Sequence, residues 1–172
     1  MDPLERSALV DYLDHSRKQY LAAFEGSENH THRHKPSPEV WSLLECAEHV
    51  AMVEDLFHKR ISTSPQTGES SKNADLEHRV RTQGVDRTKR YTAPPQVHPT
   101  GDRFETLEEA LAHFNTTRDR LIEFLQECED PRRLTGAHPL FGPMNGVELI
   151  LFAGSHALRH ADQVREIRSK GE

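Results

Sequence analysis

The sequence has little of what marks a membrane or nucleic-acid-binding protein. Its longest apolar run, residues 146–153, contains Glu148 and is far shorter than the roughly 18 residues that span a bilayer. Its 22 lysines and arginines are outnumbered by 28 acidic residues, and the net charge of −6 offers no basic footprint for nucleic acid. We therefore expect neither a membrane nor a nucleic acid as partner.

Cysteine is scarce as well. Cys46 and Cys128 are the only two, and their wide separation excludes a disulfide framework or a closely spaced metal-binding pair. The first residues, MDPLERSALV, lack the basic region and apolar stretch of a signal peptide. We expect a cytoplasmic protein, and a length of 172 residues predicts a single domain over residues 1–172.

What the sequence does contain is helical periodicity. Four segments carry apolar residues at helical spacing, and the stretches between them are rich in Pro, Gly, Ser and His. Pro38 suits a first helical turn, and Thr106 followed by Glu109 has the spacing of a capping box. We place the four predicted helices at residues 4–24, 38–61, 106–130 and 145–169.

The connections between these helices predict the topology. Two of them are about 12 to 15 residues long, which suits antiparallel neighbours, whereas roughly 40 residues separate the second helix from the third. We therefore expect an all-α four-helix bundle in which residues 63–103 form one long crossover. Within it, residues 73–81 suit a short extra helix, and the proline-rich residues 91–99 suit an extended segment over the bundle.

His156 and His160 are the clearest candidates for chemistry. Residues four apart lie on one face of a helix, where two imidazoles can bind one ion. The alternative is a pair of partly buried histidines satisfied by hydrogen bonds. His49 lies in an apolar phase of the second helix and could face the same interior. Three imidazoles with an open position are what a catalytic zinc or a related ion requires.

The motifs around these histidines resemble those of the DinB/YfiT-like family. W-S-x-x-E-C-A-E-H at residues 41–49 is similar to the second-helix motif of that family. The last loop and helix of that family resemble two runs of this chain, H-P-L-F-G-P-M-N-G-V-E at 138–148 and H-A-L-R-H-A-D-Q-V at 156–164. The stretch R-Y-T-A-P-P-Q-V-H-P-T-G at 90–101 matches its proline-rich approach to the third helix.

This resemblance implies a bundle whose divalent metal is held by His49, His156 and His160. Zinc and nickel are the first candidates for the ion, and iron and manganese the next. Family members include metal-dependent hydrolases, S-transferases that use low-molecular-weight thiols such as bacillithiol or mycothiol, and proteins without known activity. The implied partners are a small-molecule substrate, for example one of these thiols, and a second copy of the chain in a homodimer.

Several neighbours of the three histidines could take part. Glu45, one turn before His49, is the candidate catalytic residue, as a base or as the group that orients His49, with a surface carboxylate as the alternative. Gln163 is interpreted as structural. Arg159 is expected on a solvated or ion-paired face, and Glu148 could reach the mouth of the pocket.

Other residues have plainer interpretations. Cys46 could be a fourth ligand or a reactive thiol, but a buried small side chain is the commoner outcome. Trp41 is interpreted as a core residue at the end of the bundle. The alternating His30, His32 and His34 are interpreted as a polar loop. The isolated histidines are expected at the surface or in packing: His15, His58, His78, His98 and His113. The cations of the crossover could bind a substrate, with a charged, soluble loop as the alternative: Arg79, Arg81, Arg87, Lys89 and Arg90.

Three hypotheses on function therefore stand at this point. The first is a metal-dependent hydrolase or thiol S-transferase that acts on a small molecule. The second is a non-enzymatic bundle that a metal staples together. The third is a stress-linked module that binds a small ligand. A structural metal would normally have four protein ligands, so an open site would favour the enzyme.

Overall fold

The computed structural model describes residues 1–27, 32–66 and 68–171. The chain folds mainly into helices: α1 (Pro3–Ala22), α2 (Leu43–Thr63), α3 (Ala74–Gln83), α4 (Leu107–Glu127) and α5 (Gly146–Gly171). Two short 3-10 turns, η1 (Pro95–Val97) and η2 (Pro131–Arg133), and a hairpin of β1 (Thr135–His138) and β2 (Gly142–Asn145) complete it. None of these described helices is long and apolar enough to cross a membrane.

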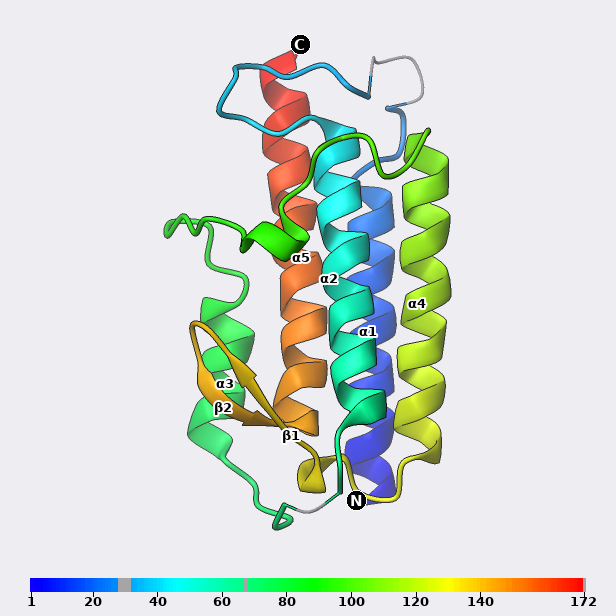
Figure 1. The fold of residues 1–172 in the computed structure, drawn as a ribbon, viewed down its shortest axis with the longest axis vertical. Helices are drawn as coiled ribbons and strands as arrows, with labels where there is room; N and C mark the ends of the chain where they lie inside the picture. Colours follow the sequence, from blue (N-terminus) through cyan, green and yellow to red (C-terminus); the bar gives the residue numbers. More distant parts are fainter. Residues whose placement is uncertain (28–31, 67, 172) are drawn as a thin grey trace.

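The long helices α1, α2, α4 and α5 form the predicted four-helix bundle (Figure 1). Figure 1 shows α2 and α4 running in one direction and α1 and α5 in the other. α2 packs against α4 and α5, and α1 packs against α5 and α4. The long crossover is therefore confirmed, because it returns the chain to the end of the bundle from which α2 started.

The crossover contains both features expected of it. α3 is the predicted extra helix, and it packs against α5 on the outside of the bundle. The proline-rich segment is extended apart from the single turn η1, and its Val97 is buried against the bundle. The crossover thus lies against the side of the bundle that α2 and α5 form (Figure 1).

The start of α2 was predicted too early. Pro38 lies before the helix, and Ser42 is the N-cap. The Ser42 hydroxyl accepts a hydrogen bond from the Glu45 N–H at 3.1 Å, and the Glu45 carboxylate accepts one from the Ser42 N–H at 2.7 Å. This reciprocal capping box satisfies two amides that the helix leaves free, so it decides where the helix begins.

The capping box predicted for the third long helix forms only in part. The Thr106 hydroxyl accepts a hydrogen bond from the Glu109 N–H at 3.1 Å, as expected for the N-cap of α4. The Glu109 carboxylate, however, accepts from the N–H of Glu105 at 2.9 Å instead of from Thr106. The helix still begins at Leu107, because the hydroxyl alone satisfies a first-turn amide.

The hairpin before α5 was not predicted. Its strands are four residues each, too short for the alternation of side chains to stand out in sequence. Gly142 closes the loop with φ of +75°, a conformation that costs little only for glycine. His138, at the end of β1, is paired with Gly142, so the turn fixes where this histidine lies.

Candidate metal centre

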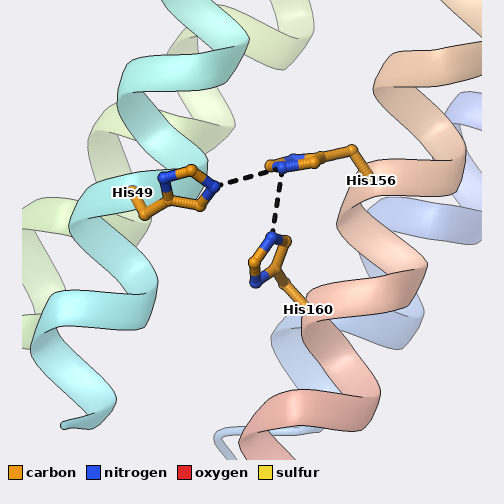
Figure 2. A group of neighbouring side chains, drawn as sticks. All are labelled: His49, His156 and His160. Carbon is orange, nitrogen blue, oxygen red and sulfur yellow. Dashed lines mark hydrogen bonds between the residues drawn. The ribbon is translucent and has the colours of Figure 1, made fainter. Parts of the chain in front are cut away.

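The three predicted histidines meet between α2 and α5 (Figure 2). His49 comes from α2, and His156 and His160 come from successive turns of α5. The Nε2 atom of His156 lies 3.2 Å from Nε2 of His49 and 3.1 Å from Nε2 of His160. All three side chains are buried, with at most 9% of any residue exposed.

Hydrogen bonding alone does not satisfy this cluster. A ring nitrogen of imidazole has one position in the ring plane, which holds either a proton or a lone pair. Nε2 of His156 contacts two other Nε2 atoms, so it can complete a hydrogen bond with only one of them. At least one lone pair of the cluster is therefore left without a donor from the described protein residues, so it is available to an ion or a molecule in the cavity.

Two of the three nitrogen–nitrogen distances in the cluster match those of a tetrahedral metal site, and the third is at most 4.8 Å. Zinc–nitrogen bonds of about 2.0–2.1 Å in a tetrahedral site place the nitrogens about 3.3 Å apart. The two shortest distances in the cluster are 3.2 and 3.1 Å, and one ligand atom from each histidine lies within 4.8 Å of the others. The donor set therefore fits a divalent first-row metal with three protein ligands.

A backbone carbonyl of the crossover orients His49. The Nδ1–H of His49 donates to the Val97 carbonyl at 2.7 Å, so Nε2 carries the lone pair that faces the cluster. Glu48, the neighbour of His49, is fully buried and accepts hydrogen bonds from the N–H groups of Thr100 and Arg103. Glu48 thereby anchors the segment whose carbonyl orients the ring.

The electrostatic environment keeps the imidazoles neutral. Burial lowers the pKa of His49 to about 4, against a partly opposing contribution from its hydrogen bond to Val97. Burial also lowers the pKa values of His156 and His160 well below the ordinary range, and the charge that a neighbouring histidine would carry lowers them further. Neutral imidazole is the form that binds a metal ion.

A cavity of about 600 Å³ opens onto the cluster. His49, His156 and His160 form part of its wall, so the nitrogens are accessible to a small molecule. Its other walls come from α2, α5, the crossover and the β1–β2 loop. A volume of this size suits a small-molecule ligand.

Trp41, which was interpreted as a core residue, and His98, which was expected at the surface or in packing, both belong to this cavity. The Trp41 ring is nearly parallel to His160, at 6.1 Å between centroids, and lies 4.9 Å from the His49 ring. His98 packs edge-on against Trp41. Both line the cavity, because the crossover brings His98 back to the start of α2. The sequence separation of more than 50 residues hid this contact.

The prediction for Arg159 was wrong. Only 8% of this residue is exposed, and its guanidinium donates to the carbonyls of Asp86 and Lys89. It also lies 5.3 Å from the ring centroid of Tyr91. A helical wheel places Arg159 away from the histidines, but the crossover covers that face as well. Arg159 therefore holds the crossover over the cavity, which it also lines.

Two acidic candidates cap helices. The Glu148 carboxylate accepts from the Asn145 N–H at 2.7 Å at the start of α5, so it does not reach the mouth of the cavity. Glu45 caps α2 and binds Lys35 at 3.0 Å, and it does not line the cavity. Its contacts are those of a helix cap, and its catalytic role stays a prediction.

The two remaining neighbours of the cluster have clear positions. Gln163 lines the cavity and accepts a hydrogen bond from Arg87 at 3.1 Å. Cys46 is fully buried, with its Sγ atom 3.7 Å from Nδ1 of His160, and burial raises the pKa of the thiol to about 12. Since this contact is to Nδ1, on the far side of the ring from the cluster, Cys46 lies outside the ligand set.

The alternating histidines do not form a metal group within the described residues. His32 contacts the Ser27 carbonyl through Nε2 at 2.9 Å, and His34 is exposed. His30 lies outside the described residues. One histidine of the cavity was missed as a site residue, namely His138 on the hairpin. The sequence H-P-L-F-G gave a weak signal for it, since proline and glycine flank the turn.

Comparisons with known proteins agree with this geometry. The chain is 28% identical over 145 residues to the uncharacterized protein YuaE of Bacillus subtilis (strain 168), a match over 80% of this chain and 83% of YuaE. The fold is similar to that of TT2238, a four-helix bundle protein, with a TM-score of 0.59 and 23% identity over 94% of this chain and 98% of TT2238.

A second solved structure is YfiT from Bacillus subtilis, described as a probable metal-dependent hydrolase with an unusual four-helix bundle topology. The TM-score is 0.66 at 12% identity, over 99% of this chain and 90% of YfiT. At such identities, both structures show a shared fold alone. The model of the DinB superfamily matches residues 12–164, which is most of the chain. The chain therefore belongs to the DinB superfamily.

Proposed function

We propose that this protein is a divalent-metal-dependent enzyme that acts on a small molecule, with His49, His156 and His160 as its metal ligands. The observation that carries the proposal is the meeting of three buried Nε2 atoms at the wall of a cavity, where the three rings cannot satisfy one another by hydrogen bonds. The description of YfiT as a probable metal-dependent hydrolase supports the same reaction class.

The chemistry follows from the donor set. A divalent ion at this site would act as a Lewis acid and would lower the pKa of a water or thiol bound to it. The chain supplies the other requirements. His49 is held in one orientation by Val97, and the aromatic ring of Trp41 shields the cluster on the side of His160. The cavity admits a substrate to the remaining open side.

We propose one of two reactions: hydrolysis of a small molecule, or transfer of a low-molecular-weight thiol to it. Zinc or nickel is the proposed ion, and iron and manganese are further candidates. The two reactions differ in the nucleophile, which is water in one and the thiol in the other. Both require one open position next to three protein ligands. The homodimer and the cytoplasmic location stay predictions.

A metal staple without catalytic function is the main alternative. A structural zinc site is normally closed by four protein ligands, whereas the described residues offer a group of three at an open cavity. The geometry therefore favours an enzyme over a staple. A ligand-binding module would use the same cavity, and turnover separates it from the enzyme.

Metal content tests the proposal. Untagged protein, purified without added metal or chelator, is measured by inductively coupled plasma mass spectrometry as wild type and as His160→Ala. The matched control is His15→Ala, since His15 is exposed and belongs to no metal group. We expect about one equivalent of ion in wild type and control, and its loss in His160→Ala.

The contrary outcome is equally clear. Wild-type protein that binds no ion, even after incubation with zinc, nickel and manganese, would contradict the metal site. If the ion is present, esters and amides are then assayed for hydrolysis and electrophiles for conjugation with small thiols. Loss of either activity in His160→Ala, with retention in His15→Ala, would assign the reaction to this centre.

A further inference from the structure

The end of the cavity next to the hairpin carries a cation without a carboxylate partner. Arg60, in the last turn of α2, lines the cavity and is partly buried. Its guanidinium donates to the Ala137 carbonyl at 2.9 Å, and no described carboxylate forms an ion pair with it. Since a guanidinium has five N–H donors, most of those of Arg60 are available to a ligand.

His138 places a second donor beside this cation. The Leu140 N–H donates to Nδ1 of His138 at 3.1 Å, so Nδ1 carries the lone pair and the ring proton is on Nε2. Burial and the nearby charge of Arg60 lower the pKa of His138 to about 4, which keeps this tautomer neutral near pH 7. His138 lines the cavity, and no described residue accepts a hydrogen bond from its Nε2–H.

An apolar wall joins these donors to the histidine cluster. The Phe152 ring lies 4.2 Å from the His138 ring and 5.6 Å from the His156 ring. Phe57 packs edge-on against Phe152 at 5.2 Å between centroids. A small molecule could therefore lie along these two phenyl rings, with one end at the donors and the other at the cluster.

The opposite end of the cavity is closer to charge balance. Arg87 forms an ion pair with Glu166 at 2.6 Å and donates to Gln163. The donors of Arg159 bind backbone carbonyls. Arg90 also lines the cavity, but its side chain is exposed, and water screens its charge. Arg60 is therefore the cation best placed to select a charged ligand.

We propose that Arg60 and His138 form a subsite for a carboxylate or phosphate at one end of the substrate. The substrate body lies against Phe57 and Phe152, and its reacting group lies at the three histidines. The placement of the reacting group rests on the proposed function. The binding of the anion does not, because neither Arg60 nor His138 belongs to the metal group.

Binding of three matched probes tests this subsite. 4-Phenylbutanoate, 3-phenylpropylphosphonate and the neutral 4-phenylbutanamide are titrated by isothermal calorimetry into chelator-treated protein and into the same protein loaded with zinc. We expect one of the anions to bind at least about tenfold more tightly than the amide, which corresponds to one charge-assisted hydrogen bond. The tighter anion identifies the group that the subsite takes.

Variants locate the anion. Arg60→Gln should remove the advantage of the anion over the amide, and His138→Phe should reduce it while retaining an aromatic ring against Phe152. Arg120→Gln is the matched control, because Arg120 is exposed on α4 and does not line the cavity. Thermal melts confirm that each variant is folded.

The outcomes separate the subsite from the metal site. Anion selectivity that persists without metal and disappears in Arg60→Gln supports the subsite, whether or not the chain binds an ion. Selectivity that requires zinc and is unchanged in Arg60→Gln places the anion on the metal and overturns the subsite. Equal affinity for all three probes, or no binding by any of them, also overturns it.

Discussion

Two of the buried polar groups in the described part of the bundle differ in how completely they are satisfied. Arg118 of α4 forms an ion pair with Glu54 of α2, and both residues are buried. Arg118 also donates to the Leu13 carbonyl at 2.8 Å and to the Ser16 hydroxyl at 2.7 Å. This group is closed, since its donors end on protein acceptors.

The histidine cluster is open by the same criterion. His156 presents one nitrogen to two others, and the cluster faces a cavity that neither Arg118 nor Glu54 lines. A closed polar group has no free donor or acceptor to offer a ligand, because each buried charge already has its partner in the protein. An open group at the wall of a cavity still has lone pairs to offer, and it can therefore bind an ion or a small molecule.

The largest effect that we expect from a single substitution tests the closed group. Arg118→Met leaves the Glu54 carboxylate buried without its partner and should lower the free energy of unfolding by about 3–5 kcal/mol. Urea denaturation followed by circular dichroism measures the change. The double variant with Glu54→Leu should recover most of the loss. A loss of less than about 1 kcal/mol in the single variant would contradict the contrast drawn here.

The second prediction concerns the pH dependence of the open group. The pKa of His49 is about 4 in the folded protein, and those of His156 and His160 are well below their ordinary value. Histidines of the unfolded chain have pKa values of about 6.5, so between about pH 4 and 6.5 the unfolded chain binds more protons than the folded protein. Stability should be full above about pH 6.5 and should fall as the pH drops toward 4, by up to about 1.4 kcal/mol per unit for each such histidine.

Urea denaturation of chelator-treated protein between pH 7 and 4 measures this slope. His156→Leu should make the slope shallower, because it removes one neutral buried imidazole. The matched control is His15→Leu, which alters an exposed histidine. An unchanged slope in His156→Leu would show that this imidazole is not held neutral by burial.

The third prediction concerns the link between the crossover and the cluster. Glu48→Gln weakens the acceptor that anchors Thr100 and Arg103, so the Val97 carbonyl no longer holds His49 in one orientation. We expect metal affinity to fall about tenfold, as for other outer contacts of metal ligands. Competition with a chelating dye measures the affinity. The control is Glu108→Gln, on the exposed face of α4, and equal losses in both variants would argue against the link.

The smallest expected effect is that of Glu45→Gln. Loss of the charged cap should lower the free energy of unfolding by about 0.5–1 kcal/mol and leave metal content unchanged. Thermal or urea denaturation and metal analysis measure the two quantities. If turnover instead falls by more than about tenfold while stability is retained, Glu45 has the catalytic role predicted from its position near His49.

The helices and the meeting of the three histidines were largely predictable, because they depend on local patterns and on the motif resemblance. The spacing of His156 and His160 places both on one helical face in any α-helix. The long crossover could also be read from the sequence, since its length contrasts with the two short connections. The start of α2 was less predictable, because Pro38 and Ser42 both suit a helix start and only the capping contacts of Glu45 decide between them.

By itself, the sequence determined the four long helices, the parallel direction of two of them and the three histidines, all of which follow from periodicity, connection length and motif resemblance. The tertiary structure alone decided the surroundings of those histidines. It brought His98, Trp41 and Arg159 to the same cavity, and it placed Arg60 against the hairpin strand that carries His138. The physical reason is that these contacts form between segments far apart in the chain, where no local pattern specifies which side chains meet.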